Sequence, residues 1–358
     1  MAEILVGAGE AAYRVVVARG ASRGLGARLR EDAGASPVMV IADDTTAALL
    51  GAALAEAAGA TLHRVADGEA SKSFAELERA CTAAAAAGLD RGSTIVAVGG
   101  GVVGDLAGTV AAVYMRGVRL VHVPTTLLAM VDSSIGGKAA VNLPQGKNLV
   151  GAFKPPAAVH VDPDLLLSLP PRQLRSGLAE VLKCSMIADE QLYGSLLANH
   201  QKLLDLEMDL LTDVVTTCCA IKAGVVTRDE RETGERAILN YGHTFGHGLE
   251  AATGYATLTH GEAVAVGMAV AARIGVEVGV TPADVEARQD ELLDAYGMAR
   301  RAPGAAGVED VLAAIGHDKK ARGGSTPWVL LESVGRATPG HDVPGDVVRG
   351  AAAWALGA

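Results

Sequence analysis

The sequence predicts an α/β protein with a Rossmann-like parallel sheet in its first half and a mainly α-helical second half. Three observations support this fold class. Short Val- and Ile-rich runs alternate with Ala-rich helical segments up to residue 162, prolines then interrupt the chain, and mostly helix-period sequence follows. With 358 residues the chain is long enough for two domains, and its 3% aromatic content indicates a core of small aliphatic side chains.

Five short apolar runs in the first half are typical of buried parallel strands. Each is rich in Val or Ile and is bounded by Gly, Pro or Asp. The runs are Tyr13–Ala18, Val38–Ile41, Thr94–Val98, Leu120–Val123 and Ala158–Val161. The intervening segments, such as Thr45–Ala58 and Phe74–Ala87, have helical periodicity. Strands and helices in alternation predict a βαβ sheet.

The character of the sequence changes after Asp162, where we place the domain boundary. Pro163, Pro170 and Pro171 interrupt the chain at this point. Helical segments follow at Leu174–Met186, Gln191–Leu206, Leu210–Val226, Ala263–Val276 and Pro282–Ala295. Trp328–Leu331 is the only later strand candidate. The predicted domains are residues 1–162 and residues 163–358.

Composition and charge exclude several classes of function. The net charge is −10 and no Lys/Arg run of the kind that follows a phosphate backbone occurs, so nucleic acid is a poor partner. We expect no apolar stretch of the roughly 18 to 20 residues that cross a bilayer, and residues 1–22 do not have the pattern of a secretory signal. The cysteines, which lack C-x-x-C spacing, predict reduced thiols; they are Cys81, Cys184, Cys218 and Cys219. These features predict a cytoplasmic protein with no membrane partner.

A glycine-rich turn follows the Thr94–Val98 strand. It contains Gly99, Gly100 and Gly101, ends in Asp105 and opens a helix. Glycines allow the backbone to approach a phosphate closely, and the start of a helix supplies free N–H donors and a partial positive charge. A tight turn without a ligand is the alternative, because the usual first-strand dinucleotide fingerprint does not apply at this middle strand.

Three charged residues stand near predicted strand ends or helix starts. Asp43 comes directly after a strand, where a carboxylate can bind a ribose, or where it is an ordinary turn residue. Glu69 and Lys72 are three residues apart just before a helix. They suit a ribose hydroxyl and a phosphate respectively, but a helix cap with solvated charges is the alternative.

Polar residues are interleaved with apolar ones between Val123 and Asn148. Asp132, Lys138 and Asn142 follow one another near a Gly-Gly pair, and Lys147 and Asn148 come soon after. A solvated surface does not normally mix such residues with Val, Ile and Leu. The segment is therefore predicted to have a functional role.

Three histidines and one carboxylate predict a metal site. His243 and His247 have the i, i+4 spacing by which one helical face offers two nitrogens to a metal, and His260 supplies a third. Glu180 adds a carboxylate from an apolar helical run, where a surface ion pair with Lys183 is the alternative. One Glu with two or three His would form an open catalytic zinc-type site.

Further charged residues precede Asn240. They are Lys222, Glu232 and Arg236. Cations near a metal and a nucleotide indicate an anionic substrate, and a phosphorylated one above all.

Taken together and in order, these motifs resemble the 3-dehydroquinate synthase family of the sugar-phosphate cyclase group. The resemblance extends from about Asp43 to Leu331. Its motifs are the glycine-rich turn ending in Asp105, Met115-Arg116-Gly117, Pro124-Thr-Thr, Asp132 with Gly-Gly-Lys138, Lys147-Asn148, Ala179-Glu180-Val-Leu-Lys183, Asn240-x-Gly-His-Thr-x-Gly-His247, His260-Gly-Glu262 and Asp318-Lys-Lys320. The fold that it implies is the same two-domain α/β architecture.

The resemblance implies three sets of site residues. A divalent metal, Zn²⁺ or Co²⁺, would be bound by Glu180, His243 and His260. NAD would be bound by Asp43, Glu69, Lys72, Gly99, Gly100, Gly101, Asp105, Thr125, Thr126, Lys138 and Lys147. The substrate would be held by Asp132, Lys138, Asn148, Lys183, Lys222, Arg236, Asn240, His247 and one of Lys319 and Lys320. Arg116 would reach into the site of a neighbouring subunit, which implies a homodimer.

The implied activity is the second step of the shikimate pathway of aromatic amino acid biosynthesis. The family converts 3-deoxy-D-arabino-heptulosonate 7-phosphate, a phosphorylated sugar acid, to 3-dehydroquinate and phosphate. The reaction combines transient oxidation by NAD, β-elimination of phosphate, re-reduction, ring opening and aldol closure.

Several alternatives remain at this point. The family pattern is changed at Ala139, at Phe153-Lys-Pro-Pro156 and at Ser325-Thr-Pro-Trp328, which leaves open aminodehydroquinate synthase or another cyclase paralogue. A metal-dependent polyol dehydrogenase of the glycerol dehydrogenase type is a second alternative, although a small neutral polyol does not need a binding site lined by several lysines. The third is an inactive NAD-binding or scaffolding protein.

Overall fold

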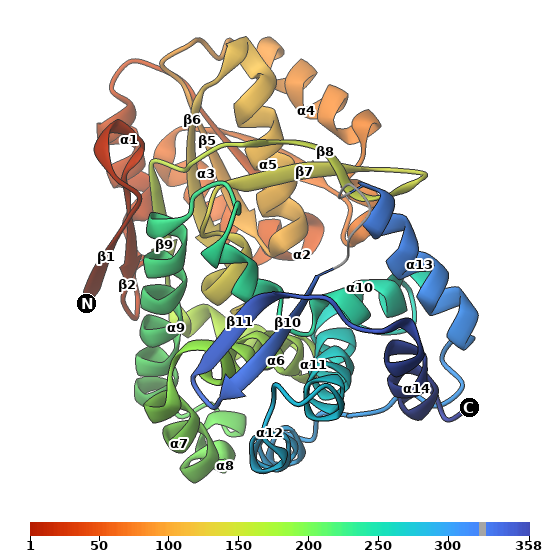
Figure 1. The fold of residues 1–358 in the computed structure, drawn as a ribbon. Helices are drawn as coiled ribbons and strands as arrows, with labels where there is room; N and C mark the ends of the chain where they lie inside the picture. Colours follow the sequence, from red (N-terminus) through yellow and green to blue (C-terminus); the bar gives the residue numbers. More distant parts are fainter. Residues whose placement is uncertain (322–326) are drawn as a thin grey trace. The chain divides into compact units, whose positions relative to one another are not determined.

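The computed structural model describes residues 1–321 and 327–358, except for the side chains of residues 10 and 317–321. The chain divides into two compact units (Figure 1). Unit 1 consists of Met1–Leu169 and Lys222–Thr227, and unit 2 of Pro170–Ile221 and Arg228–Ala358. The division at Leu169 falls later than the predicted residue 162. Asp162 binds Gly20 N at 2.8 Å, and Asp164 binds Arg19 Nε at 2.7 Å, so the segment after residue 162 is tied to unit 1.

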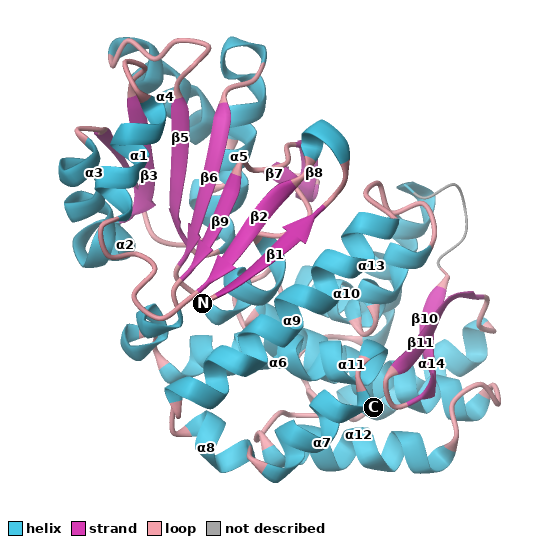
Figure 2. Cartoon of the chain, turned by 90° about the vertical axis from the view of Figure 1, so that its left-hand side faces the viewer, coloured by secondary structure: helices cyan, strands magenta, loops and turns pink. Residues whose placement is uncertain are grey.

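Unit 1 is built on a seven-stranded sheet with the order β1-β2-β9-β6-β5-β3-β4 (Figure 2). The strands are β1 Ala2–Val6, β2 Tyr13–Val17, β3 Val38–Asp43, β4 Thr61–Val65, β5 Thr94–Gly99, β6 Arg119–Pro124 and β9 Ala158–Val161. All pairs are parallel except β1 with β2. The five predicted strands and the Rossmann-like fold class are confirmed. The strands β1 and β4 were not predicted, because these edge strands carry polar residues such as Glu3 and Arg64.

Helices cover both faces of this sheet. The helical elements of unit 1 are α1 Leu25–Ala33, α2 Asp44–Thr46, η2 Ala47–Gly51, α3 Ala52–Ala58, α4 Phe74–Ala86, α5 Gly101–Val113 and the short turns η1 Gly9–Ala11, η3 Glu69–Ser71, η4 Tyr114–Arg116, η5 Ala129–Ser133 and η6 Pro163–Ser168. The predicted helix Thr45–Ala58 is thus interrupted by the π-helical turn η2.

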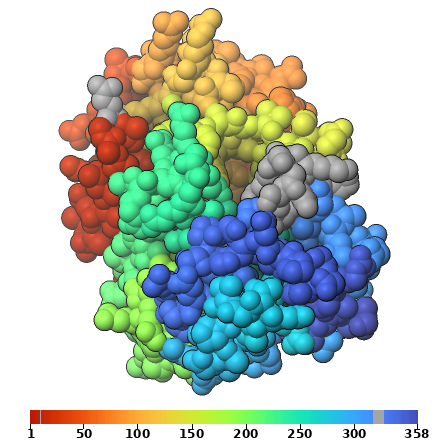
Figure 3. Space-filling model, in the orientation of Figure 1, coloured from red at the N-terminus to blue at the C-terminus, as the bar shows by residue number. Residues whose placement is uncertain are grey.

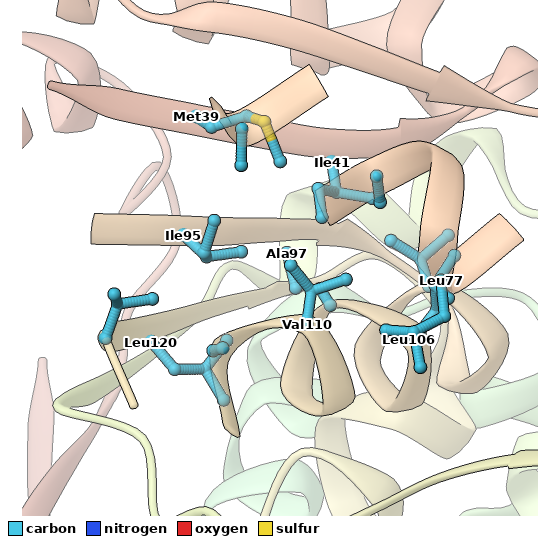
Figure 4. Close-up of a cluster of buried hydrophobic side chains, with 14 of the residues drawn as sticks. Met39, Ile41, Leu77, Ile95, Ala97, Leu106, Val110 and Leu120 are labelled. Carbon is cyan, nitrogen blue, oxygen red and sulfur yellow. The ribbon is translucent and has the colours of Figure 1, made fainter. Parts of the chain in front are cut away.

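Alternate residues of each central strand enter different cores. Met39, Ile41 and Ile95 pack against α4 and α5 (Figure 4). Val40 and Val98 point to the other face, where α1 and α3 cover them. Because both faces are buried, the strands appear in the sequence as continuous Val/Ile runs rather than as alternating patterns.

A separate hairpin completes unit 1. The strand β7 (Lys138–Leu143) pairs antiparallel with β8 (Gly146–Phe153) in a two-stranded sheet. The hairpin lies at the surface, yellow-green in Figure 3, and was not predicted. Every residue of β8 is at least partly exposed, so the segment lacks the buried apolar run that identified the central strands.

Unit 2 is mainly helical, as predicted. Its elements are α6 Pro171–Ala188, α7 Glu190–Ala198, α8 His200–Leu204, α9 Met208–Arg228, η7 Glu235–Asn240, α10 His243–Ala252, α11 His260–Glu277, α12 Ala283–Ala295, α13 Val308–Ala321, α14 Gly345–Leu356 and the hairpin β10 Trp328–Ser333 with β11 Arg336–His341. Residues Lys222–Thr227 of α9 belong to unit 1. The predicted helix Gln191–Leu206 is two helices that meet at Asn199, and β11 was not predicted.

Helix α11 lies among the helices of unit 2 and is almost entirely buried. Two glycines let neighbouring backbones approach it closely. A Cβ on Gly261 would lie 2.1 Å from the carbonyl oxygen of Ser176 in α6, and one on Gly267 would lie 1.9 Å from that of Gly242, just before α10. Only glycine fits at these positions, and the close packing holds α6, α10 and α11 together.

The sequence predicts no segment long and apolar enough to cross a membrane, but one described helix meets this criterion. By length and composition, α9 is apolar enough to cross a bilayer, and half of its most apolar 18-residue window is buried inside the structure. A core helix can pass the same test, so this is weak evidence for a membrane segment.

Candidate cofactor and metal sites

A carboxylate and two imidazoles gather in unit 2. Glu180 comes from α6, His243 from the first turn of α10 and His260 from the first turn of α11. One ligand atom from each lies within 4.8 Å of the other two. The close helix packing at Gly261 and Gly267 brings these sequence-distant residues together. Nitrogen and oxygen ligands in this arrangement suit a zinc-type ion with an open position.

The Nδ1 atoms of both imidazoles also have hydrogen-bond partners. His243 Nδ1 lies 3.1 Å from the carbonyl oxygen of Tyr241, and His260 Nδ1 lies 3.1 Å from Oε2 of Glu250. A partner on Nδ1 selects the tautomer that leaves Nε2 available to a metal. Both Nε2 atoms face Glu180 Oε1, at 3.5 Å from His243 and 3.6 Å from His260.

Glu180 is buried, and neither of its carboxylate oxygens accepts a hydrogen bond from the described residues. The ammonium group of Lys183 lies beside Oε2, so the predicted i, i+3 pair exists but is buried, not on the surface. Burial alone would raise the pKa of Glu180, but Lys183, His243 and His260 outweigh it and hold the pKa well below the ordinary value. Oε1 of this ionised carboxylate has no hydrogen-bond partner among the described residues and faces both imidazole Nε2 atoms, so the set fits a divalent metal.

The two imidazoles differ in their electrostatics. Burial, aided by the charge of Lys183, lowers the pKa of His243 well below its usual range. Burial would also lower the pKa of His260, but its contacts with Glu180 and Glu250 raise it to about 10. The two carboxylates therefore make His260 the more basic imidazole of the pair.

The other predicted site residues of unit 2 lie near this cluster or on the segment that leads to it. The His247 ring centroid is 5.1 Å from that of His243 and 5.8 Å from that of His260. Arg236 is buried, and its guanidinium donates to the Glu230 carbonyl. Asn240 Nδ2 donates to Glu232 Oε1 at 2.5 Å. The structure thus brings His247 to the cluster and holds Arg236 and Asn240 in the η7 segment just before α10.

In unit 1, the glycine-rich turn joins β5 to α5 as predicted. A Cβ on Gly99 would lie 2.6 Å from Val103, and one on Gly100 would lie 3.2 Å from Thr126. Thr125 follows β6, its N–H donates to Gly99, and its buried hydroxyl has no hydrogen-bond partner among the described residues. An orphan hydroxyl beside a glycine turn at a helix N-terminus fits a phosphate-bearing ligand.

This turn lies where the strand order of the sheet reverses. The chain runs outward from β3 to β4 and returns to β5 on the other side of β3. Ligands of open α/β sheets bind at such a point, at the carboxyl ends of the strands. Asp43 stands at the end of β3, where its carboxylate accepts from Thr46 N at 2.7 Å and caps α2.

Lys72 lies in a polar network of unit 1. Its side chain is buried, and its ammonium group contacts the Asp105 carboxylate and the Asn148 side-chain oxygen. Burial raises the pKa of Asp105, although Lys72 opposes this shift. The predicted alternative of solvated charges is therefore wrong for Lys72.

The remaining predicted residues of unit 1 occupy separate places. Lys222 donates to the carbonyl oxygen of Asp132 at 2.7 Å and also contacts its carboxylate. Lys138 is exposed at the start of β7. Arg116 is exposed on η4 and has a positive φ of 67°. Lys319 and Lys320 have side chains outside the described residues.

Two residues of these sites had no assigned role in the sequence. Glu250 holds His260, and its spacing of three residues from His247 on the same helix is the only sequence signal. Asn142 donates to Glu69 Oε1 at 2.7 Å, and only its place in the Val123–Asn148 segment pointed to it.

Comparisons with known families and proteins agree with this geometry. Residues 62–176 match the model for the 3-dehydroquinate synthase N-terminal region, and residues 177–321 match the model for the C-terminal region. The 3-dehydroquinate synthase of Rhodopseudomonas palustris (strain BisB18) is 42% identical to this chain. The alignment is 358 positions long and covers 96% of this chain and 94% of that protein.

Solved structures of related cyclases have the same fold. A 2-deoxy-scyllo-inosose synthase complexed with carbaglucose-6-phosphate, NAD⁺ and Co²⁺ has a TM-score of 0.88 and 29% identity, covering 99% of this chain and 100% of that chain. The 2-epi-5-epi-valiolone synthase from Streptomyces hygroscopicus, with NAD⁺ and Zn²⁺ bound, has a TM-score of 0.83 and 27% identity, covering 95% of both chains. The two family models together span most of the chain, and on this evidence the chain belongs to the 3-dehydroquinate synthase family.

Proposed function

We propose that this chain is a 3-dehydroquinate synthase that depends on NAD and a divalent metal. The observation that carries the proposal is the Glu180–His243–His260 cluster, in a chain that belongs to this family. The substrate would be 3-deoxy-D-arabino-heptulosonate 7-phosphate, and the products 3-dehydroquinate and phosphate. NAD would accept and return one hydride, and the metal would supply a Lewis acid.

In unit 2, Glu180, His243 and His260 would hold the metal. Their contacts with Lys183, Tyr241 and Glu250 keep the carboxylate ionised and the imidazoles oriented before a metal binds. The ammonium group of Lys183 is itself held by the Leu239 carbonyl at 2.7 Å. The site is therefore organised in advance, which reduces the reorganisation that the reaction requires.

In unit 1, the turn at Gly99–Gly101 and the hydroxyl of Thr125 would bind the NAD phosphates. The carboxylates of Asp43 and Glu69 would bind ribose hydroxyls. Lys72 and Asp105 are already paired, so the ammonium group is placed before NAD binds. The exposed Lys138 at the start of β7 would contribute a positive charge towards an anionic substrate.

The protein needs to position the substrate more than it needs a strong base. Once the carbinol is oxidised, the neighbouring C–H is acidic and the substrate phosphate can accept its proton before it leaves. Lysine, arginine, asparagine and histidine side chains then suffice to hold the anionic groups in place. Lys222 fits this role because Asp132 fixes its ammonium group.

Other sugar-phosphate cyclases are the main alternative. The curated relative that is named 3-dehydroquinate synthase shares 42% of its residues with this chain, whereas the two cyclases of other name share 29% and 27%. This difference favours the heptulosonate over another sugar phosphate. A polyol dehydrogenase is disfavoured because it has no use for buried cations such as Lys183 and Lys222.

We also propose that the protein is a homodimer formed through β8. Leu149 is 55% exposed and Phe153 is 47% exposed on this strand, whose sheet has only two strands among the described residues. An edge strand with exposed apolar side chains is suited to pairing with a second copy. Analytical ultracentrifugation of the wild-type chain and of Phe153→Glu should show a dimer and a shift towards monomer. A wild-type monomer would contradict this assignment.

The cytoplasm is the expected location. All four cysteines are free thiols, which suits a reducing compartment.

The decisive experiment is phosphate release from 3-deoxy-D-arabino-heptulosonate 7-phosphate with catalytic NAD and Zn²⁺, followed by identification of the carbocyclic product. Formation of 3-dehydroquinate without net NADH supports the proposal. No release by a chain that binds both NAD and zinc would contradict it and favour another cyclase. Continuous accumulation of NADH with a polyol would instead identify a dehydrogenase.

A further inference from the structure

The side chain of Asn142 on β7 connects three segments of unit 1. Its Nδ2 donates to Glu69 Oε1 at 2.7 Å, and its Oδ1 accepts from the backbone N–H of Asn148 at 2.9 Å. The backbone N–H of Asn142 also donates to the Lys72 carbonyl at 2.9 Å. Asn142 therefore contacts η3 through Glu69, Lys72 directly after η3, and β8 through Asn148.

The two side-chain bonds require a side chain that both donates and accepts, as an amide does. A carboxylate can only accept and a backbone N–H can only donate, so the group between Glu69 and Asn148 must donate at one end and accept at the other. An aspartate at position 142 would still accept from Asn148 but would place a second carboxylate against Glu69. An alanine would lose both bonds.

Asn142 also stands at the irregular point of the hairpin. The pairing of β7 and β8 shifts between Val141 and Leu143, whose partners are Val150 and Gly146. Asn142 is therefore opposed by the three residues 147–149, which form a bulge. Bulges commonly redirect side chains next to functional sites.

The bulge is stabilised by the Asn142 side chain. Asn148 has a φ of +59°, a left-handed conformation that asparagine tolerates better than most residues. Its N–H bonds to a side chain instead of a ladder carbonyl. In this conformation the Asn148 side chain meets Lys72, and Lys147 Nζ lies 3.8 Å from Glu69 Oε2.

We propose that Asn142 is a positioning residue that couples the cofactor side of unit 1 to its substrate side. At one end it orients Glu69, which would bind NAD, and at the other it holds the bulge that presents Asn148, which would bind substrate. The inference rests on the proposed function for the identity of these ligands. The coupling itself rests on the contacts of Asn142.

Two substitutions distinguish the contact of Asn142 with Glu69 from its contact with Asn148. Asn142→Ala removes both bonds, so hydrogen exchange of the Asn148 amide should become about tenfold faster, and both the Kd for NAD and the KM for the heptulosonate phosphate should rise about tenfold. Asn142→Asp keeps the acceptor for Asn148. Amide exchange should stay near the wild-type rate, while NAD binding weakens at least about tenfold because of repulsion from Glu69.

The matched control is Gln145→Glu, the same amide-to-acid change at an exposed position of the same hairpin. It should leave exchange, NAD affinity and KM unchanged. Wild-type exchange of the Asn148 amide in Asn142→Ala would overturn the proposal. So would equal losses of NAD and substrate binding in Asn142→Asp.

The proposed function and this role of Asn142 can fail separately. Exchange of the Asn148 amide is measured on the ligand-free protein, and NAD titration needs no substrate. A wild-type chain that binds NAD but releases no phosphate would contradict the proposed function. NAD titration and hydrogen exchange of the Asn148 amide would still decide whether Asn142 connects Glu69 to the bulge.

Discussion

The metal cluster of unit 2 stands on three helices, whereas the polar network of unit 1 stands on strand ends and a hairpin. Glu180 and His243 are buried, and close helix packing holds them in place. In unit 1, Glu69 and Asn148 are more exposed. The Asn142 side chain holds both: it donates to the Glu69 carboxylate and accepts from the Asn148 backbone N–H. A metal site needs a fixed set of ligands, whereas a nucleotide site needs backbone that a large ligand can reach.

The comparison predicts that the two sites can be damaged independently. A substitution in the helical cluster should abolish metal binding without weakening NAD binding. One in the hairpin should weaken ligand binding without loss of metal.

The largest effect is expected from His260→Ala. Removing one of three metal ligands should abolish zinc binding and lower activity by about 10³-fold or more, because the metal contributes several kcal/mol to the transition state. NAD affinity and the circular dichroism spectrum should not change. The control is His341→Ala, on β11 of the same unit. Wild-type turnover in folded His260→Ala would contradict the metal assignment.

Acid should destabilise unit 1 through His122. This residue is buried in β6, near the Gly99–Gly101 turn, and burial lowers its pKa to about 4. Its folded pKa lies below the unfolded value of about 6.5, so its contribution is complete above pH 6.5 and is lost as the pH falls towards 4. The loss is about 3 kcal/mol of unfolding free energy.

Urea unfolding at pH 7 and pH 4 tests this prediction. His122→Gln cannot take up the proton, so it should lose about 3 kcal/mol less than the wild type between these pH values. Equal losses in the two proteins would show that the pKa of His122 is the same in the folded and unfolded states, which would contradict the prediction.

Glu250 tests how far the metal cluster depends on its surroundings. Glu250→Ala removes the partner of His260 Nδ1, and zinc affinity should fall about 10- to 100-fold in a competition titration with a chelator. Glu250→Gln can still accept a hydrogen bond and should lose less. The exposed Glu277→Ala, on the same helix as His260, is the control. Unchanged affinity in Glu250→Ala would refute the role of Glu250.

The smallest effect is expected in the hairpin. Lys138→Met removes one exposed cation, so the KM for the heptulosonate phosphate should rise about tenfold while the NAD affinity changes far less. The exposed Lys202→Met is a control for loss of a positive charge. Equal losses of substrate and NAD affinity would mean that the substrate site is misplaced.

Much of the fold could be predicted because buried strands and helices have recognisable patterns of apolar residues. The central strands appear as Val/Ile runs and the long helices of unit 2 as periodic patterns. The strands β1, β4, β7, β8 and β11 could not be predicted in this way. They lie at edges or in hairpins, and their stability comes from pairing with a neighbour rather than from an apolar run.

The candidate site could be predicted in part. The i, i+4 spacing indicated that His243 and His247 share a helical face, but it could not show that Glu180 joins His243 and not His247. That choice depends on the packing of α6 against α11. The pairing of Asn142 with Glu69 likewise depends on how the hairpin meets η3.

The sequence by itself determined the types of ligand that the chain offers and the helices, turns and central strands that carry them. These follow from local propensity and from the periodicity of apolar residues. Only the tertiary structure decided the environment of each group. It buried the ion pair of Glu180 and Lys183, directed the Nε2 atoms of His243 and His260 towards Glu180 Oε1 and set Asn148 in a bulge. Burial and charge depend on residues far apart in the chain, and sequence spacing does not encode their distances.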